Sequence, residues 1–188
     1  MTKKFHRAFG VYGIIGNDEG LVVIKKNGGP YINRFDLPGG SLEDGEGLQS
    51  AIVREIKEET GLEPDKLTQL GVTSFKYPWS YERWRYNQHI CVFYEVVSST
   101  GDLNYSVSQF IGQDSLGALR IPLEKLTIEN SSPLVLKAKD FLQKQRIFDP
   151  TNCQIKCNFL PKKTSDGVFQ PKTLRGRLFK SLTNFAIS

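Results

Sequence analysis

Three glutamates, Glu55, Glu58 and Glu59, lie three and four residues apart in a segment of strong helix formers. In a helix this spacing places side chains on one face. At about 100° per residue, Glu55 and Glu59 fall inside the apolar stripe that runs through Leu48 and Ile52, and Glu58 borders it. Carboxylates that face the protein interior need a compensating positive charge.

The place of these acids along the helix strengthens that requirement. Gly61 predicts the end of the helix, so Glu58 and Glu59 lie in the last turn, where acids are disfavoured by up to about 1 kcal/mol each. Arg54 is about 100° from Glu55 around the helix and is not expected to neutralise all three acids. A divalent cation can do so, and oxygen ligands favour Mg²⁺, with Mn²⁺ as the alternative, over zinc.

The competing explanation is a surface helix stabilised by salt bridges. Such pairs would join Glu55 to Lys57 or Glu59 to Lys66, and neither has the i, i+4 spacing that favours pairing on a helix. The segment Leu37-Pro38-Gly39-Gly40 just before the helix brings bare backbone close to the acids, since glycine permits approaches barred to other residues. A Gly-Gly pair is unspecific by itself, and its meaning comes from its distance to the acidic helix.

The whole segment resembles the signature of the Nudix family. That signature is Gly, five residues, Glu, seven residues, then Arg-Glu-aliphatic-x-Glu-Glu-x-Gly-aliphatic. Nine fixed positions within 23 residues match it: Gly40, Glu46, Arg54, Glu55, Ile56, Glu58, Glu59, Gly61 and Leu62. A weaker likeness extends over residues 5–145, with Phe35 where the family frequently has tryptophan.

The resemblance implies an α/β fold, an α/β/α sandwich with a mixed β-sheet, and a loop-helix-loop whose glutamates bind Mg²⁺. By the family pattern Glu58 and Glu59 are metal ligands, Glu55 is a ligand or the general base, and the carbonyl of Gly40 completes the metal site. Arg54 resembles the residue that holds Glu55 or Glu46 in place. The catalytic residues expected are therefore Arg54, Glu55 and Glu58.

The implied reaction is hydrolysis of the diphosphate linkage of a nucleoside diphosphate joined to another moiety. In this chemistry a metal-activated water attacks phosphorus and no covalent nucleophile is required. The loop residue Glu46 is then structural. The family resemblance leaves the substrate open among oxidised nucleoside triphosphates, ADP-ribose, nucleotide sugars and dinucleoside polyphosphates.

Other residues offer chemistry that the signature does not assign. Acids elsewhere are candidate general bases, although each is an ordinary surface acid on its own: Glu82, Glu95 and Asp114. Several aromatic residues are candidates for stacking a nucleobase, although aromatics in strands usually belong to the core: Tyr31, Trp79, Tyr81, Trp84 and Tyr86. The two histidines, His6 and His89, lie in expected strands and are not expected to be catalytic.

The elements that position these residues alternate between strands and helices. Patterns of β-branched and aromatic residues predict strands at 9–15, 21–26, 68–77, 86–97 and 118–122. Helical periodicity and helix formers predict helices at 47–60 and from Ser132-Pro133 to about Gln145. Interleaved strands and helices indicate a mixed α/β domain.

This domain is expected to span residues 1–148, followed by a basic tail over 149–188. From Arg146 onward 8 basic and 2 acidic residues give +6, and the remaining 17 basic and 18 acidic residues give −1, which sum to the net charge of +5. The tail has prolines and no sustained periodicity, which predicts an irregular or partly disordered appendage, with a short amphipathic helix over 173–185 as a weak signal. Charged runs are usually solvated, so nucleic acid is not an expected partner.

Three cysteines without metal-site spacing favour a reduced, cytoplasmic protein. No apolar run is long enough for a signal peptide or a membrane span. The expected partner is a small nucleotide-like diphosphate, and a homodimer is left open. The alternative functions are a catalytically silent Nudix-fold sensor, which the intact glutamates disfavour, and an isomerase, for which no paired Cys and Glu are seen.

Overall fold

The computed structural model of the chain describes residues 4–108 and 114–154. A five-stranded sheet runs through its centre in the order β5-β1-β7-β6-β9. Its strands are β1 (Phe5–Ile14), β5 (Gly39–Gly40), β6 (Glu63–Tyr81), β7 (Trp84–Thr100) and β9 (Cys153–Gln154). Strand β1 is parallel to β7, whereas β6 is antiparallel to β7, so the sheet is mixed as expected.

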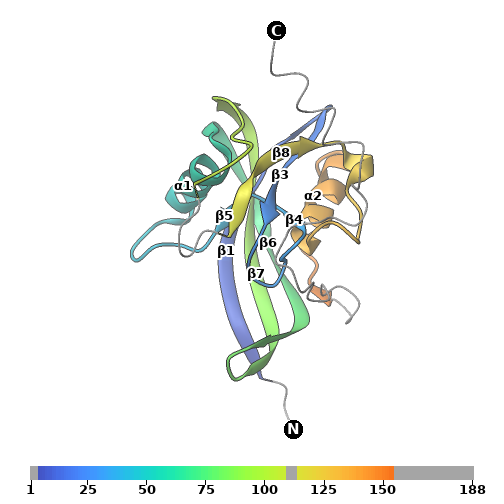
Figure 1. Ribbon diagram of the computed structural model, residues 1–188. Helices are drawn as coiled ribbons and strands as arrows, with labels where there is room; N and C mark the ends of the chain where they lie inside the picture. Colours follow the sequence, from blue (N-terminus) through green and yellow to red (C-terminus); the bar gives the residue numbers. More distant parts are fainter. Residues whose placement is uncertain (1–3, 109–113, 155–188) are drawn as a thin grey trace.

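A smaller sheet is built around β3 (Gly20–Lys26), which pairs with three other strands. These are β2 (Gly16–Asn17), β4 (Phe35–Asp36) and β8 (Ser115–Ile121). Helix α1 (Leu48–Thr60) and helix α2 (Pro133–Gln143) lie on opposite sides of the strands (Figure 1). The arrangement confirms the predicted α/β fold with a mixed sheet between helices.

Alternation along β1 divides the interior into two cores. Val11 points toward α1 and joins Ile52 and Ile56 in one apolar cluster. Tyr12 points the other way and joins a cluster with Phe141 of α2. Because successive side chains of a strand face opposite sides of the sheet, a single strand anchors both helices.

The hairpin of β6 and β7 is longer than the sequence predicts. Glu63 pairs with Thr100 and Tyr81 with Trp84, so both strands extend beyond the expected limits of 68–77 and 86–97. The added residues away from the turn, 63–67 and 98–100, are largely polar and exposed, so they carry no apolar alternation, and at the turn end Pro78 interrupts the strand pattern. Pairing with the partner strand, rather than burial, makes these residues extended.

Helix α2 begins at the predicted position because its cap is local. The Ser132 hydroxyl accepts a hydrogen bond from the Val135 N–H, and Pro133 occupies the first turn, where its missing N–H has no cost. None of the described helices is long and apolar enough to cross a membrane.

Contacts to the sheet continue past the expected domain limit at residue 148. The Thr73 hydroxyl donates to the Thr151 carbonyl at 2.8 Å, and the Ser74 N–H and hydroxyl both donate to the Asn152 side chain. Lys137 of α2 lies 3.4 Å from Asp149. The remainder of the expected tail, including the helix suggested for 173–185, lies outside the described residues.

We expect a chain ending at Phe148 to be less stable than one ending at Gln154 by roughly 1–3 kcal/mol, because the buried Ser74 loses its partner. Urea unfolding of the two truncations beside the full chain measures the difference. The longer truncation should match the full chain. Equal stability of both truncations would show that residues 149–154 do not contribute to the fold.

Candidate active site

Helix α1 ends at Thr60, one residue after the last of its glutamates, with Gly61 as the cap. Gly61 adopts a left-handed φ of 78°, and its N–H donates to the Lys57 carbonyl. A side chain at Gly61 would lie 2.7 Å from Asn104, so the position favours glycine for its conformation and for the space around it. The cap holds Glu58 and Glu59 in the final turn, as the sequence predicts.

Glu59 is buried within that turn. The residue is only 4% exposed, and one of its carboxylate oxygens accepts a hydrogen bond from the Gly39 N–H at 2.8 Å. Gly39 has a φ of 143°, and a Cβ there would lie 2.1 Å from the Val11 carbonyl oxygen. Only glycine therefore allows this backbone segment to lie between β1 and the Glu59 carboxylate.

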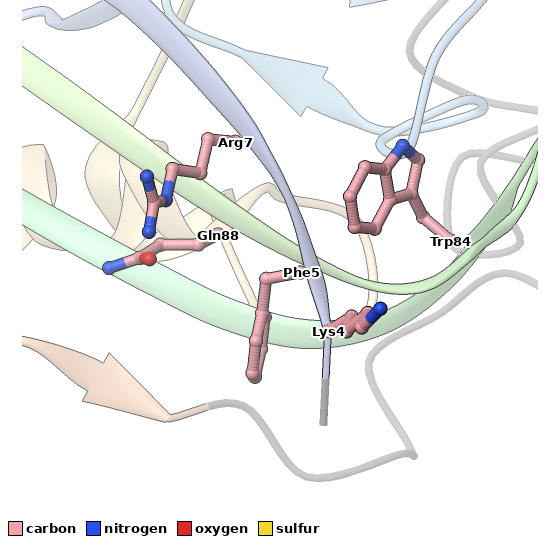
Figure 2. Close-up of a pocket in the computed structure, with 5 residues that line it drawn as sticks. All are labelled: Lys4, Phe5, Arg7, Trp84 and Gln88. Carbon is pink, nitrogen blue, oxygen red and sulfur yellow. The ribbon is translucent and has the colours of Figure 1, made fainter. Parts of the chain in front are cut away.

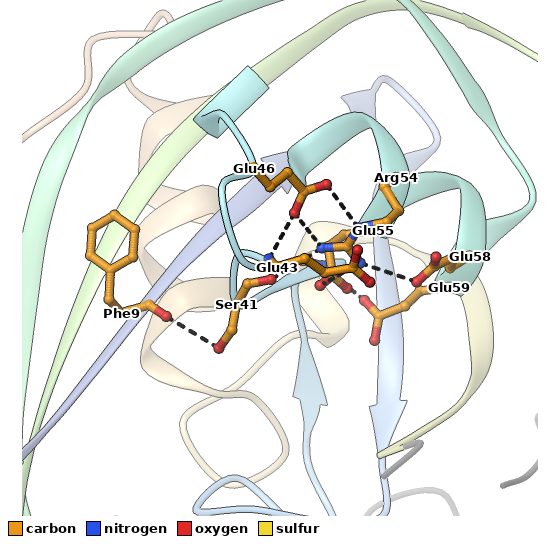
Figure 3. A network of polar contacts seen from close by, with 9 residues as sticks. Phe9, Ser41, Glu43, Glu46, Arg54, Glu55, Glu58 and Glu59 are labelled. Atoms are coloured by element: carbon orange, nitrogen blue, oxygen red, sulfur yellow. Dashed lines mark hydrogen bonds and ion pairs between the residues drawn. The ribbon is translucent and has the colours of Figure 1, made fainter. Parts of the chain in front are cut away.

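Arg54 organises the acids on the outer side of the helix (Figure 3). Its guanidinium donates to both oxygens of Glu46, at 2.9 and 2.8 Å, in a bidentate pair. The same group donates to Glu55 at 3.1 Å and to Glu58 at 3.3 Å. A fifth contact reaches the Ser41 carbonyl at 3.1 Å, so one side chain joins the loop to the helix.

The bidentate pair has the expected effect on the loop acid. The Arg54 guanidinium beside Glu46, together with the Glu43 N–H, lowers the pKa of Glu46 to about 2. Glu46 is thus a fixed anion that holds Arg54 in place. The sequence allowed Arg54 to orient either Glu55 or Glu46, and in the structure it contacts both.

Glu55 lies against the glycine pair. A Cβ at Gly40 would be 2.5 Å from one Glu55 carboxylate oxygen, and one at Gly10 would be 2.8 Å from the Gly40 carbonyl oxygen. The Glu55 side chain is 14% exposed, and burial raises its pKa although Arg54 acts to lower it. A side chain at Gly40 would therefore fill the space beside this carboxylate, whereas one at Gly10 would crowd the Gly40 carbonyl.

Burial raises the pKa of Glu59 well above its usual value. The largest opposing effects come from the charge of Lys26 at the end of β3 and from the Gly39 N–H, and both act to lower this pKa. Burial acts to lower the pKa of Lys26, but the carboxylates of Asp114, Asp36 and Glu59 raise it overall. The structure therefore keeps a desolvated acid beside an ammonium group that forms an ion pair with Asp114.

The three helix acids differ in their surroundings. Glu59 is buried, Glu55 is largely covered, and Glu58 has a side chain that is 55% exposed. Within residues 4–108 and 114–154, no three acidic, histidine or cysteine side chains are already arranged as a metal cluster. The acids are instead separated by the Arg54 guanidinium and by the Gly39 hydrogen bond of Glu59.

The donor set nevertheless fits a hard divalent cation. Carboxylates and a backbone carbonyl are the ligands that Mg²⁺ and Mn²⁺ prefer. Glu59 has no Lys or Arg within ion-pair distance among the described residues, and burial of an uncompensated carboxylate is costly. A cation at this position would supply the missing charge.

The other candidate bases are engaged or distant. Glu95 forms an ion pair with Arg146, and Asp114 forms one with Lys26. Glu82 is exposed in the β6–β7 turn. Of the three, only Asp114 acts electrostatically on Glu59.

The candidate stacking residues separate into buried and exposed positions. Tyr31 is in the core and contacts His89, whose pKa burial lowers to about 3. Trp79 packs against the core edge-on to His6, 6.1 Å between ring centroids. Tyr86 packs on Phe5 and Trp84 lines a cavity, as described below, while the side chain of Tyr81 lies outside the described part.

Lys26 and Asp36 are site neighbours that sequence reasoning missed. Asp36 is buried, accepts a hydrogen bond from Ser132 at 2.6 Å, and has a pKa raised to about 6 by burial. Both residues stand at the ends of short strands that meet in the pair of β3 with β4. A lysine closing an otherwise apolar strand was the available signal.

We expect Arg54→Gln to lower the free energy of unfolding by roughly 1–3 kcal/mol, because Glu46, Glu55 and Glu58 lose a shared cation. Lys57→Gln is the matched control on the same helix. Lys57 pairs with exposed Glu63, and such pairs contribute at most about 1 kcal/mol. Urea unfolding that shows equal effects of the two substitutions would contradict an organising role for Arg54.

Two curated proteins are similar to part of the chain. An ADP-ribose pyrophosphatase from Methanocaldococcus jannaschii is 49% identical over 69 residues, 37% of this chain and 41% of that protein. An 8-oxo-dGTP diphosphatase from Escherichia coli is 30% identical over 82 residues, 38% of this chain and 64% of that protein. The matches thus span less than two thirds of either relative.

Solved structures share the fold. A MutT NUDIX hydrolase from Burkholderia pseudomallei superposes with a TM-score of 0.58 at 20% identity and covers 72% of this chain and 97% of its own. The NUDIX domain of Shewanella oneidensis NrtR, complexed with ADP ribose, gives 0.57 at 16% identity, with 74% and 88% covered. The model of the NUDIX domain matches residues 4–142. With that match over most of its length and the complete signature from Gly40 through α1 to Leu62, the chain belongs to the Nudix family.

Proposed function

We propose that this chain is a magnesium-dependent hydrolase that cleaves the diphosphate linkage of a nucleoside diphosphate joined to another moiety. The observation that carries the proposal is the buried Glu59 carboxylate, held by the Gly39 N–H beside Glu55 and the glycine loop. A protein that only binds a nucleotide gains nothing from burying an acid at the negative end of a helix.

Glu55, Glu58, Glu59 and the Gly40 carbonyl would hold Mg²⁺, or Mn²⁺ in its place. When bound, the ion neutralises phosphate oxygens and lowers the pKa of a bound water. Glu58 is already exposed toward solvent, and Glu55 faces the glycine loop, so these two acids border the space that a phosphate would enter. The buried Glu59 would add a further negative charge from the interior side of the site.

Proton transfer is assigned to Glu55. Burial raises its pKa, and a carboxylate with a raised pKa is better matched to accepting a proton from water near neutral pH. Arg54 fixes the Glu55 carboxylate by a hydrogen bond of 3.1 Å, and Glu46 fixes Arg54. Asp114 is tied to Lys26 by an ion pair, which makes it the weaker candidate for the base.

The relatives support the proposed substrate class. One is an ADP-ribose pyrophosphatase, another an 8-oxo-dGTP diphosphatase, and one structural neighbour carries ADP ribose. All of these compounds contain a nucleoside joined to a diphosphate. ADP-ribose is therefore the first compound to test, followed by nucleoside triphosphates and nucleotide sugars.

We expect Mg²⁺-dependent release of a nucleoside monophosphate from at least one member of that panel, and none in EDTA. Product identification by chromatography separates cleavage within the diphosphate from loss of a terminal phosphate. Glu59→Gln should lower kcat by roughly 100-fold or more, since it removes a metal ligand. Glu63→Gln, the same change at an exposed glutamate just after the helix, should leave kcat unchanged.

Folding of the Glu59→Gln variant can be checked independently. Burial raises the pKa of Glu59, so the wild-type chain in EDTA loses stability as pH rises above the usual value of 4.5, and the glutamine variant should lose less because only Asp36 and Glu55 of the buried acids then ionise. The variant should therefore be the more stable protein at neutral pH. Nucleotide binding by the wild type without release of product from any compound would favour a silent sensor over a hydrolase.

A further inference from the structure

The central sheet has an open surface at the start of β1, on the side of the sheet that α1 packs against but beyond the end of that helix. Phe9 and Val72 on this face are 43% and 47% exposed. Helix α1 therefore covers Val11 and its neighbours but leaves the other end of the sheet open. The cross-strand pairing fixes which side chains share this open end.

Two rows of side chains cross the open face. The first consists of Arg7, Gln88 and Lys76, which are register partners on β1, β7 and β6. The second begins with Phe5 and Tyr86, whose rings lie 5.4 Å apart. Because side chains alternate along each strand, the cationic row and the aromatic row are adjacent on the same face.

A cavity of about 610 Å³ opens here, lined by Lys4, Phe5, Arg7, Trp84 and Gln88 (Figure 2). Its volume lies within the range of about 300–1,000 Å³ that is usual for small-ligand sites. The lining combines two cations, two aromatic rings and one amide. The Arg83 guanidinium lies 4.9 Å from the centre of the Trp84 ring and adds a third cation at the rim.

The positive charge of this surface is not balanced within the described part of the chain. Neither Arg7 nor Lys76 has a carboxylate within ion-pair distance among those residues, and the paired rows contain no acid. Unpaired cations next to aromatic rings attract an anion that also presents a flat ring.

We propose that this cavity binds a nucleoside phosphate, with the base stacked on Trp84 or Phe5 and the phosphate held by Arg7, which lines the cavity, and by Lys76, which is the register partner of the lining residue Gln88 on the next strand. Gln88, between the two cations, offers an amide to either part of the ligand. Proteins that bind single-stranded nucleic acid without sequence preference stack bases on aromatic side chains and hold phosphates with cations. The same two contacts can bind one nucleotide.

The cavity is separate from the catalytic acids. Val11 pairs with Gly40 at the acidic helix, whereas Phe5 lies six residues earlier on β1, about 20 Å away at about 3.3 Å per residue. Trp79 contacts His6, which alternates with Phe5 and Arg7 and so faces the other side of the sheet. Each face of this sheet end thus carries one of the two tryptophans of the chain.

Fluorescence of the Trp79→Phe variant reports on Trp84 alone. In EDTA, AMP should quench this emission saturably, and adenosine or inorganic phosphate should bind more weakly than AMP. Arg7→Gln and Lys76→Gln should each weaken AMP binding roughly fivefold or more, as expected for loss of a charged contact. Arg85→Gln, on the neighbouring but oppositely directed position of β7, is the matched control and should leave binding unchanged.

AMP titrations of this background with Mg²⁺ and with EDTA, each repeated with Glu59→Gln added, separate this site from the catalytic one. AMP binding that is equal with and without Mg²⁺ and is unchanged by Glu59→Gln supports a second site. Binding that requires both Mg²⁺ and Glu59 would assign the signal to the catalytic centre and overturn the proposal. The proposal is also overturned if AMP causes no quenching at millimolar concentration, if Arg7→Gln behaves as Arg85→Gln, or if only a single-stranded oligonucleotide binds. Thermal unfolding of each variant confirms that it is folded.

Discussion

The carboxylate of Glu59 is buried in the last turn of α1, where the helix dipole and the low dielectric of the core both disfavour an anion. The surrounding structure is arranged around that cost. Gly39 provides a hydrogen bond, Gly61 stops the helix so that the acid remains in the final turn, and β1 packs directly against Gly39. Lys26 contributes the largest favourable charge interaction but is held by Asp114, so within the described residues the acid has no direct ion pair. The site is thus folded with an electrostatic deficit that a divalent cation would remove.

Arg54 has a different part in the same design. Arg54 contacts Glu46 of the loop and Glu55 and Glu58 of the helix, and its positive charge reduces the repulsion among these three acids. It reaches two of the three helix acids and leaves Glu59, which matches the expectation that one arginine cannot neutralise all of them. A bound metal would therefore share Glu55 and Glu58 with a guanidinium that already holds both acids near the loop. The bidentate pair with Glu46 anchors Arg54 to that loop.

The features of the fold and of the candidate site that depend on local sequence were predictable. The features that depend on pairing between distant strands were not. Helical period identified the buried face of Glu59, and Gly61 marked the helix end. Residues 63–67 of β6 and 98–100 of β7 are mostly polar and showed no strand pattern, because only their pairing with each other makes them extended. The position of Lys26 beside Glu59 arises from the meeting of two sheets. The row of Arg7, Gln88 and Lys76 likewise exists only in the register of three strands, so no spacing in the sequence announces it.

The central claim is that the carboxylates of α1 hold a divalent cation. Electron paramagnetic resonance of Mn²⁺ tests it without reference to substrate, because the signal of free Mn²⁺ falls as the ion binds. Titration of the wild-type chain and of Glu59→Gln, each compared with Glu63→Gln, should show binding by the wild type and the Glu63 variant and at least about tenfold weaker binding by the Glu59 variant. Equal Mn²⁺ affinity of all three proteins would contradict the account.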